Sequence, residues 1–297
     1  MVLPAVLLWG VGTLSTEFAR LHIPIRWGVF GWSIRLGQIS NLLLVLVVVV
    51  LLQRRLLNSI RSQRQMALDV KQAQEMRQMI LPESRTTISG MMIESEYRPA
   101  REVGGDFFQV IPYRSDGSLL IVAGDVDGRG LQAGILVALL VGAIRTAASL
   151  STDPRSVLDQ LNLRLLGRNN AQATCLALYI DADGEATLAN AGHMAPYLNG
   201  APMQVEGALP LGMLAAAEFS VNHFRLHESD RLVLISDGVV EARDADGRLF
   251  GLERVQELLH TAVSAAEVAN AAQIFGQEDD ISVISVTRTA VTEPALV

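Results

Sequence analysis

An uncharged run near the N-terminus constrains this chain more than any other feature. Residues 36–53 carry no charged side chain, and residues 42–52 have no polar face. A helix needs about 20 apolar residues to cross a bilayer, and a helix that is apolar all round is either a membrane span or a buried core helix. The run therefore predicts a transmembrane helix, with a buried core helix as the alternative.

Positive charge follows this run at once, as Arg54, Arg55, Arg61 and Arg64. Positive residues beside a span mark its cytoplasmic side. We therefore expect an inner-membrane protein whose remaining chain lies in the cytoplasm.

The first 16 residues are also uncharged, but they lack the basic start of a secretory signal. We expect a second span there, or the remainder of one from a longer multi-span receptor. All three tryptophans lie within residues 1–53, as is typical of interfacial belts. They are Trp9, Trp27 and Trp32.

Residues 54–80 contain no glycine or proline and are rich in helix formers, which predicts one juxtamembrane helix that Pro82 ends. Its apolar stripe is only a partial heptad pattern. Two interpretations stay open: a solvated spacer, and a parallel coiled coil that makes a homodimer and passes a signal between subunits.

Charge divides the chain into two parts. Residues 1–80 hold nine Lys or Arg against three Asp or Glu, whereas the remainder holds 15 Arg against 28 acids. An acidic domain repels nucleic-acid phosphate, so DNA and RNA are excluded as the main partner. An apolar content of 50% excludes disorder, and a single cysteine, Cys175, excludes a disulfide scaffold.

After Pro82 the sequence changes to short apolar runs separated by turn residues, which predicts consecutive strands in mostly antiparallel pairing with helices packed outside. The predicted strands are 90–97, 106–112, 119–126, 174–180, 186–190, 219–226, 231–236 and 281–286. The predicted helices are 131–149, 155–167 and 252–262, and a disordered tail is expected from 289 to 297.

Carboxylates occur where several of these apolar strands end. Such acids at the edge of a core raise each other's pKa unless a cation compensates them. Oxygen ligands without a nearby Cys or His cluster favour Mg²⁺ or Mn²⁺ over Zn²⁺, and nearby glycines let carbonyls and waters approach an ion. The acids are Asp106, Asp125, Asp237, Asp279 and Asp280, and the glycines are Gly104, Gly105, Gly124 and Gly238.

The order of these motifs resembles that of the metal-dependent (PPM-type) Ser/Thr protein phosphatases, in their SpoIIE-like bacterial branch. The resemblance covers residues 81–288. The matching stretches are Glu102-Val103-Gly104-Gly105-Asp106-Phe107-Phe108, Gly124-Asp125-Val126-Asp127-Gly128-Arg129-Gly130-Leu131, Asn190-Ala191-Gly192-His193-Met194-Ala195-Pro196, Pro210-Leu211-Gly212, Leu234-Ile235-Ser236-Asp237-Gly238-Val239-Val240-Glu241-Ala242, Phe250-Gly251 and Asp279-Asp280-Ile281-Ser282.

The resemblance implies an α+β fold, an α-β-β-α sandwich, with two Mn²⁺ or Mg²⁺ ions in a cleft at one end of the sheets. It implies that Asp125 bridges the ions with help from the Val126 carbonyl. Asp106 would serve one ion, and Asp237 and Asp279 the other. Asp280 is the weaker candidate of its pair, as a ligand or as support for one.

Two such ions lower the pKa of a shared water and neutralise charge on the phosphoryl oxygens. The catalytic group is then a metal-bound water, and no protein nucleophile is needed. Cys175 lies in an apolar run and is read as a small buried residue. The expected reaction is hydrolysis of phosphoserine or phosphothreonine, and the family implies a phosphorylated anti-sigma-factor antagonist as the substrate protein.

Three positions depart from the family pattern or lack a settled role. Arg129 stands where many relatives carry His or Lys, and it either contacts phosphate or faces solvent. Gln109 replaces an acid, which puts a secondary metal or network contact in question. We expect His193 to fix the turn formed by residues 190–196, not to act in catalysis.

Two other functions compete with this interpretation. A receptor module that binds without catalysis is disfavoured because all four principal acids are retained. A two-metal hydrolase of small phosphate esters or nucleotides is disfavoured because the chain has no phosphate-binding loop motif, and its one lysine is Lys71. The expected organisation is a membrane segment (1–53), a signalling helix (54–80), the phosphatase domain (81–288) and a tail (289–297).

Overall fold

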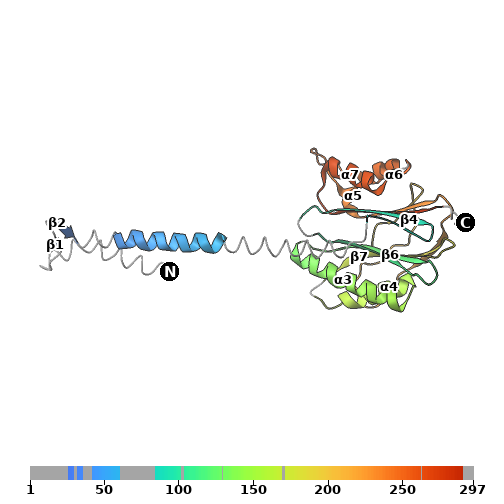
Figure 1. Cartoon of the computed structure of the whole chain (residues 1–297), viewed down its shortest axis with the longest axis horizontal. Coiled ribbons are helices and arrows are strands. Elements are labelled where there is room, and N and C mark those ends of the chain that lie inside the picture. Colours follow the sequence, from blue (N-terminus) through green and yellow to red (C-terminus); the bar gives the residue numbers. More distant parts are fainter. Residues whose placement is uncertain are drawn as a thin grey trace, which may run out of the picture. The chain divides into compact units, whose positions relative to one another are not determined.

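The computed structural model describes residues 26–29, 32–35, 42–60, 84–101, 104–128, 130–168, 171–261 and 263–289. The chain divides into two compact units, Met1–Asp69 and Val70–Val297, and each is described separately here. Figure 1 labels several elements of each unit.

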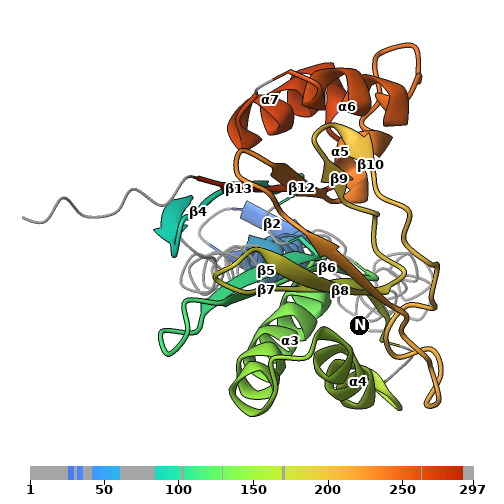
Figure 2. The same cartoon turned by 90° about the vertical axis from the view of Figure 1, so that its right-hand side faces the viewer.

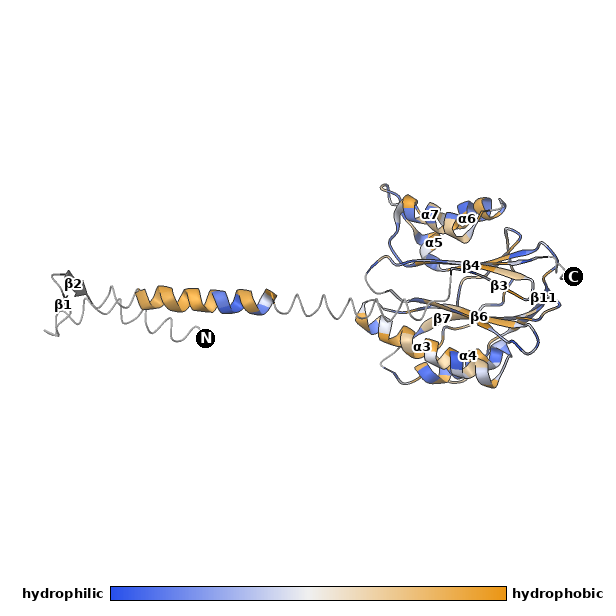
Figure 3. Ribbon diagram, in the orientation of Figure 1, coloured by the Kyte–Doolittle hydropathy of each residue, from blue (hydrophilic) through white to orange (hydrophobic). Residues whose placement is uncertain are grey.

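The first unit contains a hairpin and a helix. Strands β1 (Arg26–Val29) and β2 (Trp32–Arg35) pair antiparallel, although the sequence predicts no strands there. The helix Leu42–Ile60 is long and apolar enough to cross a membrane, and its most apolar window is unburied. Figure 3 shows the apolar colour along most of this helix. It overlaps the predicted span 36–53 and continues without a break past Arg54 and Arg55 to Ile60.

Several predictions lie outside the described residues. They concern a span in residues 1–16, the helix beyond Ile60 and the tail beyond Thr289. Thr289 itself is bonded to the domain, since its N–H and its hydroxyl both donate to the Gly90 carbonyl, at 2.7 and 2.9 Å.

The second unit is a sandwich of two antiparallel sheets. One sheet has the strand order β10-β9-β12-β13-β4-β3 and the other β11-β8-β7-β6-β5. The first sheet consists of β3 (Arg85–Ile88), β4 (Met91–Arg98), β9 (Tyr197–Leu198), β10 (Ala201–Pro202), β12 (Arg231–Ile235) and β13 (Ile281–Arg288). The second sheet consists of β5 (Asp106–Pro112), β6 (Leu119–Val126), β7 (Ala173–Ile180), β8 (Glu185–Ala191) and β11 (Val221–Arg225).

Helices cover the outer face of each sheet. Figure 2 shows α3 (Leu131–Leu150) and α4 (Pro154–Leu165) on the five-stranded sheet. On the other side lie α5 (Asp237–Glu241), α6 (Gly251–Leu259) and α7 (Ala265–Gly276). The predicted α-β-β-α sandwich is therefore confirmed.

Three apolar cores hold these four layers together. The middle core joins the sheets through residues such as Ile93, Ile121 and Ile284. A second packs α3 and α4 onto the five-stranded sheet, and a third packs α6 and α7 onto the other. Strand β6 is buried on both faces, which explains its continuous apolar sequence.

Local signals account for the starts of α4 and α7. The Asp153 carboxylate accepts from the N–H groups of Arg155 and Ser156, and Pro154 starts α4, one residue before the predicted start. Helix α7, which was not predicted, begins with a capping box between Ser264 and Glu267. The sequence also did not predict the short elements β3, β9, β10 and α5.

Helix α3 also passes the length and hydropathy test for a membrane span, but 39% of its most apolar window is buried in the sandwich. This is the behaviour of a core helix. Length and hydropathy alone therefore do not separate the two helices. Of the helices that pass this test in the described part of the chain, Leu42–Ile60 is the one whose most apolar window is unburied within its own unit.

Asn162 joins α4 to the stretch Pro210-Leu211-Gly212 and the residues after it. Its amide donates to the Leu214 carbonyl at 2.9 Å and its side-chain oxygen accepts from Gly212 N–H at 2.7 Å. The residue is 2% exposed. We expect Asn162→Ala to lower the free energy of unfolding by about 1–3 kcal/mol, because a buried side chain and its two hydrogen bonds are lost. Denaturant titration measures this, and exposed Gln132→Ala on α3 should stay within roughly 0.5 kcal/mol.

Candidate functional site

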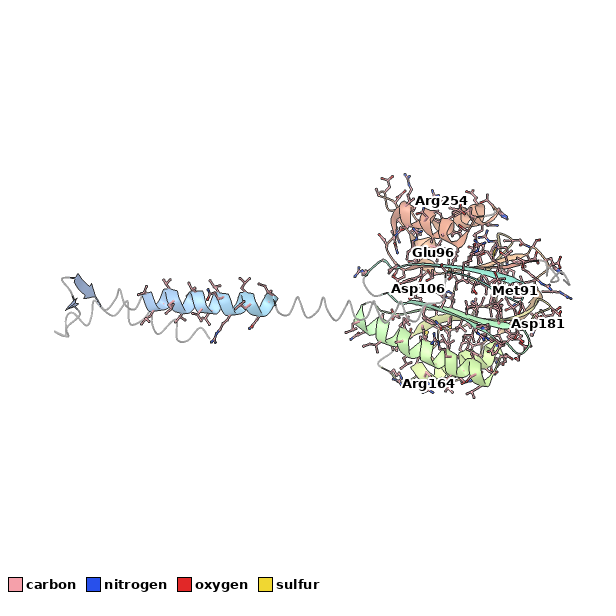
Figure 4. The ribbon with its side chains drawn as sticks, in the orientation of Figure 1. Met91, Glu96, Asp106, Arg164, Asp181 and Arg254 are labelled. Carbon is pink, nitrogen blue, oxygen red and sulfur yellow. The ribbon has the colours of Figure 1, made fainter. Side chains whose placement is uncertain are left out.

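Strand pairing brings the first two predicted acids together. Asp106 begins β5, Asp125 lies near the end of β6, and the register of the two strands sets them directly opposite each other. Figure 4 shows Asp106 between the two sheets at one end of the sandwich. A cleft of about 420 Å³ opens there, lined by Asp125, Val126, Asp127, Gly128 and Asp279.

The opposite sheet supplies the other two acids. Asp237 follows β12 and starts α5, while Asp279 lies two residues before β13. Strands β12 and β13 are neighbours, and the pairing extends to Ser236 N–H, which donates to the Ser282 carbonyl at 3.0 Å. Acids that are far apart in the sequence therefore reach one end of the sandwich from both sheets.

Asp106 is the most deeply buried of these acids, at 1% exposure. Its carboxylate accepts a hydrogen bond of 2.6 Å from the Ser282 hydroxyl. Burial raises the pKa of Asp106 well above its usual range, and the charges of Asp125 and Asp280 add to this effect, while the Ser282 bond opposes it.

The same repulsion acts on Asp125 and Asp237. Burial, followed by the charges of Asp237 and Asp279, raises the pKa of Asp125 to about 7. Burial, followed by the charges of Glu241 and Asp279, raises the pKa of Asp237. These acids therefore share one electrostatic environment, in which added positive charge would favour the ionised forms.

Two glycines allow the acids to crowd against the backbone. A Cβ atom on Gly105 would overlap the Asp125 carboxylate and would lie 2.7 Å from the Val126 carbonyl oxygen. A Cβ atom on Gly104 would overlap the carboxylate of Asp280. We expected these glycines to give ions access, but here they make room for the carboxylates themselves.

The donor set fits hard divalent cations. It combines carboxylates that repel one another with the Val126 carbonyl at the cleft, and oxygen donors of this kind suit Mg²⁺ and Mn²⁺. Among the described residues, no three His, Cys, Asp or Glu side chains are already gathered closely enough to hold a metal ion.

Comparison with known proteins identifies the family of the folded domain. The model of the family "Stage II sporulation protein E (SpoIIE)" matches residues 115–289, more than half of the chain. The chain belongs to the SpoIIE family. Its folded domain is thus a SpoIIE-type PPM (PP2C-like) Ser/Thr phosphatase domain, which confirms the resemblance seen in the motifs.

Individual relatives are distant. "Protein IcfG" of Synechocystis sp. is 22% identical over 264 residues, which are 74% of this chain and 42% of that protein. "Phosphoserine phosphatase RsbU" of Bacillus subtilis is 26% identical over 209 residues, 64% of this chain and 61% of that protein. The chain thus spans about half the length of these curated relatives.

A solved structure supports the fold. The SiaA-PP2C domain of Pseudomonas aeruginosa has a TM-score of 0.65 and 22% identity, and the match covers 77% of this chain and 99% of that one. At this identity the likeness concerns the fold alone.

Within this SpoIIE-type domain, His193 is held from two sides. The Asn190 side chain accepts from His193 N–H at 2.8 Å and donates to the His193 carbonyl at 2.9 Å. The ring Nδ1 lies 2.9 Å from the Thr174 hydroxyl, and Thr174 is opposite Asp125 in the strand register. Burial lowers the pKa of His193 to about 4, so the ring is neutral at pH 7.

Three other residues named in the sequence analysis, Gln109, Cys175 and Arg129, have different outcomes. The Gln109 amide donates to the Phe108 carbonyl at 2.7 Å and accepts from Arg145 of α3 at 3.1 Å, a helix contact in place of an acid. Cys175 is buried, and burial raises the pKa of its thiol. Arg129 lies outside the described residues, so its contact with phosphate stays a prediction.

Sequence reasoning missed the residues that support the acids. Ser236 and Ser282 are hydrogen-bonded to each other beside the acids: Ser282 N–H donates to the Ser236 hydroxyl at 2.9 Å. The signal was present in both motifs, because each places a serine one or two residues from an acid. Tyr97, in contrast, carries no motif, and only the fold brings its hydroxyl to Asp280 at 3.2 Å.

The raised pKa of Asp125 predicts a pH-dependent stability of the metal-free protein. A carboxyl with a folded pKa of about 7 and an unfolded pKa of about 4 binds its proton more tightly when folded. It therefore destabilises the fold above pH 7, and this effect fades as the pH falls toward 4. We expect Asp125→Asn to raise the melting temperature in EDTA at pH 8 but not at pH 4.5.

Thermal unfolding followed by circular dichroism measures this difference. An equal gain at both pH values would contradict the prediction. Excess Mn²⁺ provides the matched control, because it should stabilise the wild-type protein by mass action and leave Asp125→Asn almost unaffected.

Proposed function

We propose that this chain is a membrane-anchored, metal-dependent protein phosphatase that hydrolyses phosphoserine or phosphothreonine in bacterial signalling. One observation carries the proposal. Four carboxylates from the two sheets lie at one end of the sandwich, where Asp125 and Asp279 line an open cleft, and burial together with the neighbouring acids raises the pKa of Asp125. A cluster of this kind suits cation-assisted chemistry on an anionic substrate.

The residues that would hold two divalent ions are Asp106, Asp125 with the Val126 carbonyl, Asp237 and Asp279. Two Mn²⁺ or Mg²⁺ ions, when bound, would supply a water of lowered pKa and positive charge for the phosphoryl oxygens. The assignment is supported by the burial of Asp106 and by the position of Asp279 on the cleft wall.

In this mechanism the protein residues hold the site in place, and none of them acts as a nucleophile. The Ser282 hydroxyl holds one oxygen of the Asp106 carboxylate, which fixes the direction in which the other oxygen points. His193 is neutral at pH 7 and bonded to Thr174, which suits support of the β7 end of the site. Cys175 is buried with a raised thiol pKa, so it does not serve as a nucleophile.

Loss of one central acid tests the assignment. We expect Asp125→Asn and Asp237→Asn each to abolish Mn²⁺-dependent phosphate release from a phosphopeptide, with a fall in kcat of at least about 100-fold. The reason is that the ions would no longer bind and would no longer lower the pKa of a water. Phosphate release measured over a Mn²⁺ titration gives the answer.

Asp181→Asn is the matched control. Asp181 lies at the other end of the sheets (Figure 4), and its side chain accepts from the N–H groups of Asp183 and Glu185 in a turn. Asparagine keeps that acceptor, so activity should be unchanged. Retained activity in both site variants would remove the basis of the proposal.

The protein substrate is proposed to be a phosphorylated anti-sigma-factor antagonist. Membership of the SpoIIE family supports this, as does the similarity to a relative named phosphoserine phosphatase RsbU. A panel of such phosphoproteins, an aryl phosphate and nucleotides would separate the alternatives. Turnover of nucleotides alone indicates a small-molecule hydrolase, and no turnover of any substrate indicates a receptor module.

Membrane anchoring is proposed from the exposed apolar helix Leu42–Ile60 and the arginines in and after it. We propose a membrane segment over residues 1–53 in the inner membrane and a signalling helix over 54–80, with the phosphatase domain in the cytoplasm. We expect the full chain to stay in the membrane pellet after alkaline carbonate extraction. The 81–297 fragment, which carries the sandwich, should stay in the supernatant.

Coupling between the signalling helix and the site requires two defined states. We propose that the helix, alone or as a homodimer through residues 54–80, controls the segment that leads from Asp125 into α3. A comparison of kcat for the full chain and the 81–297 fragment tests this. Equal activity of the two, with no dependence on dimerisation, would overturn the coupling but not the phosphatase assignment.

A further inference from the structure

Asp279 and Asp280 are neighbours in the chain but occupy different environments. Asp279 is exposed and lines the cleft, whereas Asp280 is 3% exposed. The two consecutive acids, which directly precede β13, therefore differ in their surroundings. The buried acid therefore needs an explanation of its own.

Donors from one stretch of chain engage both oxygens of the Asp280 carboxylate. Oδ1 accepts from Ala100 N–H at 3.0 Å. Oδ2 accepts from the Tyr97 hydroxyl at 3.2 Å and from Asp106 N–H at 3.4 Å. The side chain thus joins the end of β4 to the first residue of β5, which is itself an assigned ligand.

The backbone of Asp280 joins two further segments. Its carbonyl accepts from the Ser236 hydroxyl at 3.1 Å, next to Asp237. Its N–H donates to the Asp279 carboxylate at 2.9 Å. Gly238 packs so closely that a Cβ atom there would overlap the Asp280 carbonyl. Asp280 is therefore hydrogen-bonded to two assigned ligands, Asp106 and Asp279, and to Ser236, the neighbour of the third, Asp237.

We propose that Asp280 is a positioning residue of the metal centre: it does not bind an ion, but it holds the segments that carry Asp106, Asp237 and Asp279 in register. Tyr97 is its partner in this role. The inference rests on the proposed two-metal function and deepens it. Supporting contacts around metal ligands commonly determine metal affinity, since their loss costs about 10–100-fold.

Two measurements on the full chain in detergent test this proposal. The first is Mn²⁺ affinity, obtained from the electron paramagnetic resonance signal of free Mn²⁺. The second is kcat at saturating Mn²⁺. Asp280→Asn keeps the shape but replaces one acceptor oxygen by a donor. We expect it to weaken Mn²⁺ binding by about 10-fold or more. Its kcat at saturating Mn²⁺ should stay within about threefold of wild type, because the ions and their ligands remain.

Tyr97→Phe removes one donor and keeps the fold and the Asp280 charge. We expect it to weaken Mn²⁺ binding by about threefold, less than the loss of a whole supporting residue. Tyr113→Phe is the matched control, because the Tyr113 hydroxyl donates to the Ala148 carbonyl at 2.9 Å, a contact that belongs to the end of α3 and not to the acids. It should leave Mn²⁺ affinity unchanged.

Unchanged Mn²⁺ affinity in Tyr97→Phe and Asp280→Asn would overturn the proposal. So would a loss of kcat in Asp280→Asn that saturating Mn²⁺ does not restore, because that is the behaviour of a direct ligand, expected of Asp279→Asn. If Asp280→Asn does not fold, Tyr97→Phe against Tyr113→Phe decides. A wild-type protein that binds Mn²⁺ without releasing phosphate would refute the proposed function and still allow the affinity comparison.

Discussion

Mutual repulsion between carboxylates is the constraint around which this domain is built. Asp106, Asp125 and Asp237 all have raised pKa values, first because they are buried and then because other acids face them. Such an arrangement opposes folding unless something else holds the acids in place. Three apolar cores provide that stability, and the two sheets provide the geometry. The site is thus unfavourable in itself and depends on the sandwich for its existence.

The sandwich brings the acids together through strand register and not through local sequence. Asp106 and Asp125 face each other because β5 and β6 pair, and the other acids arrive through the pairing of β12 with β13. A slip of one residue in either pairing would turn an acid to the opposite face. The long apolar strands that fix the register therefore contribute to function as directly as the acids do.

The sequence predicted much of this, and its failures have physical causes. The limits of β5 and β6 were predicted to the residue, because long apolar runs end at clear turn residues. Strand β3 was missed because it is four residues long and only half-buried. The acids were found through their motifs, but the contacts of Asp280 with Tyr97 and Ala100 join residues about 180 positions apart, and no local pattern encodes such a distance.

Helix α3 raises a problem for biosynthesis. It has almost the same mean hydropathy as the helix Leu42–Ile60, 1.9 against 2.0, yet it belongs to a folded domain. In the proposed membrane-anchored chain, the insertion machinery would read hydrophobicity before tertiary structure exists, and an arginine within a span raises the free energy of insertion. Arg145 is the one charge in α3, and it also bonds Gln109 of β5. One side chain thus ties the helix to its sheet and weakens its competition for the lipid phase as the chain is made.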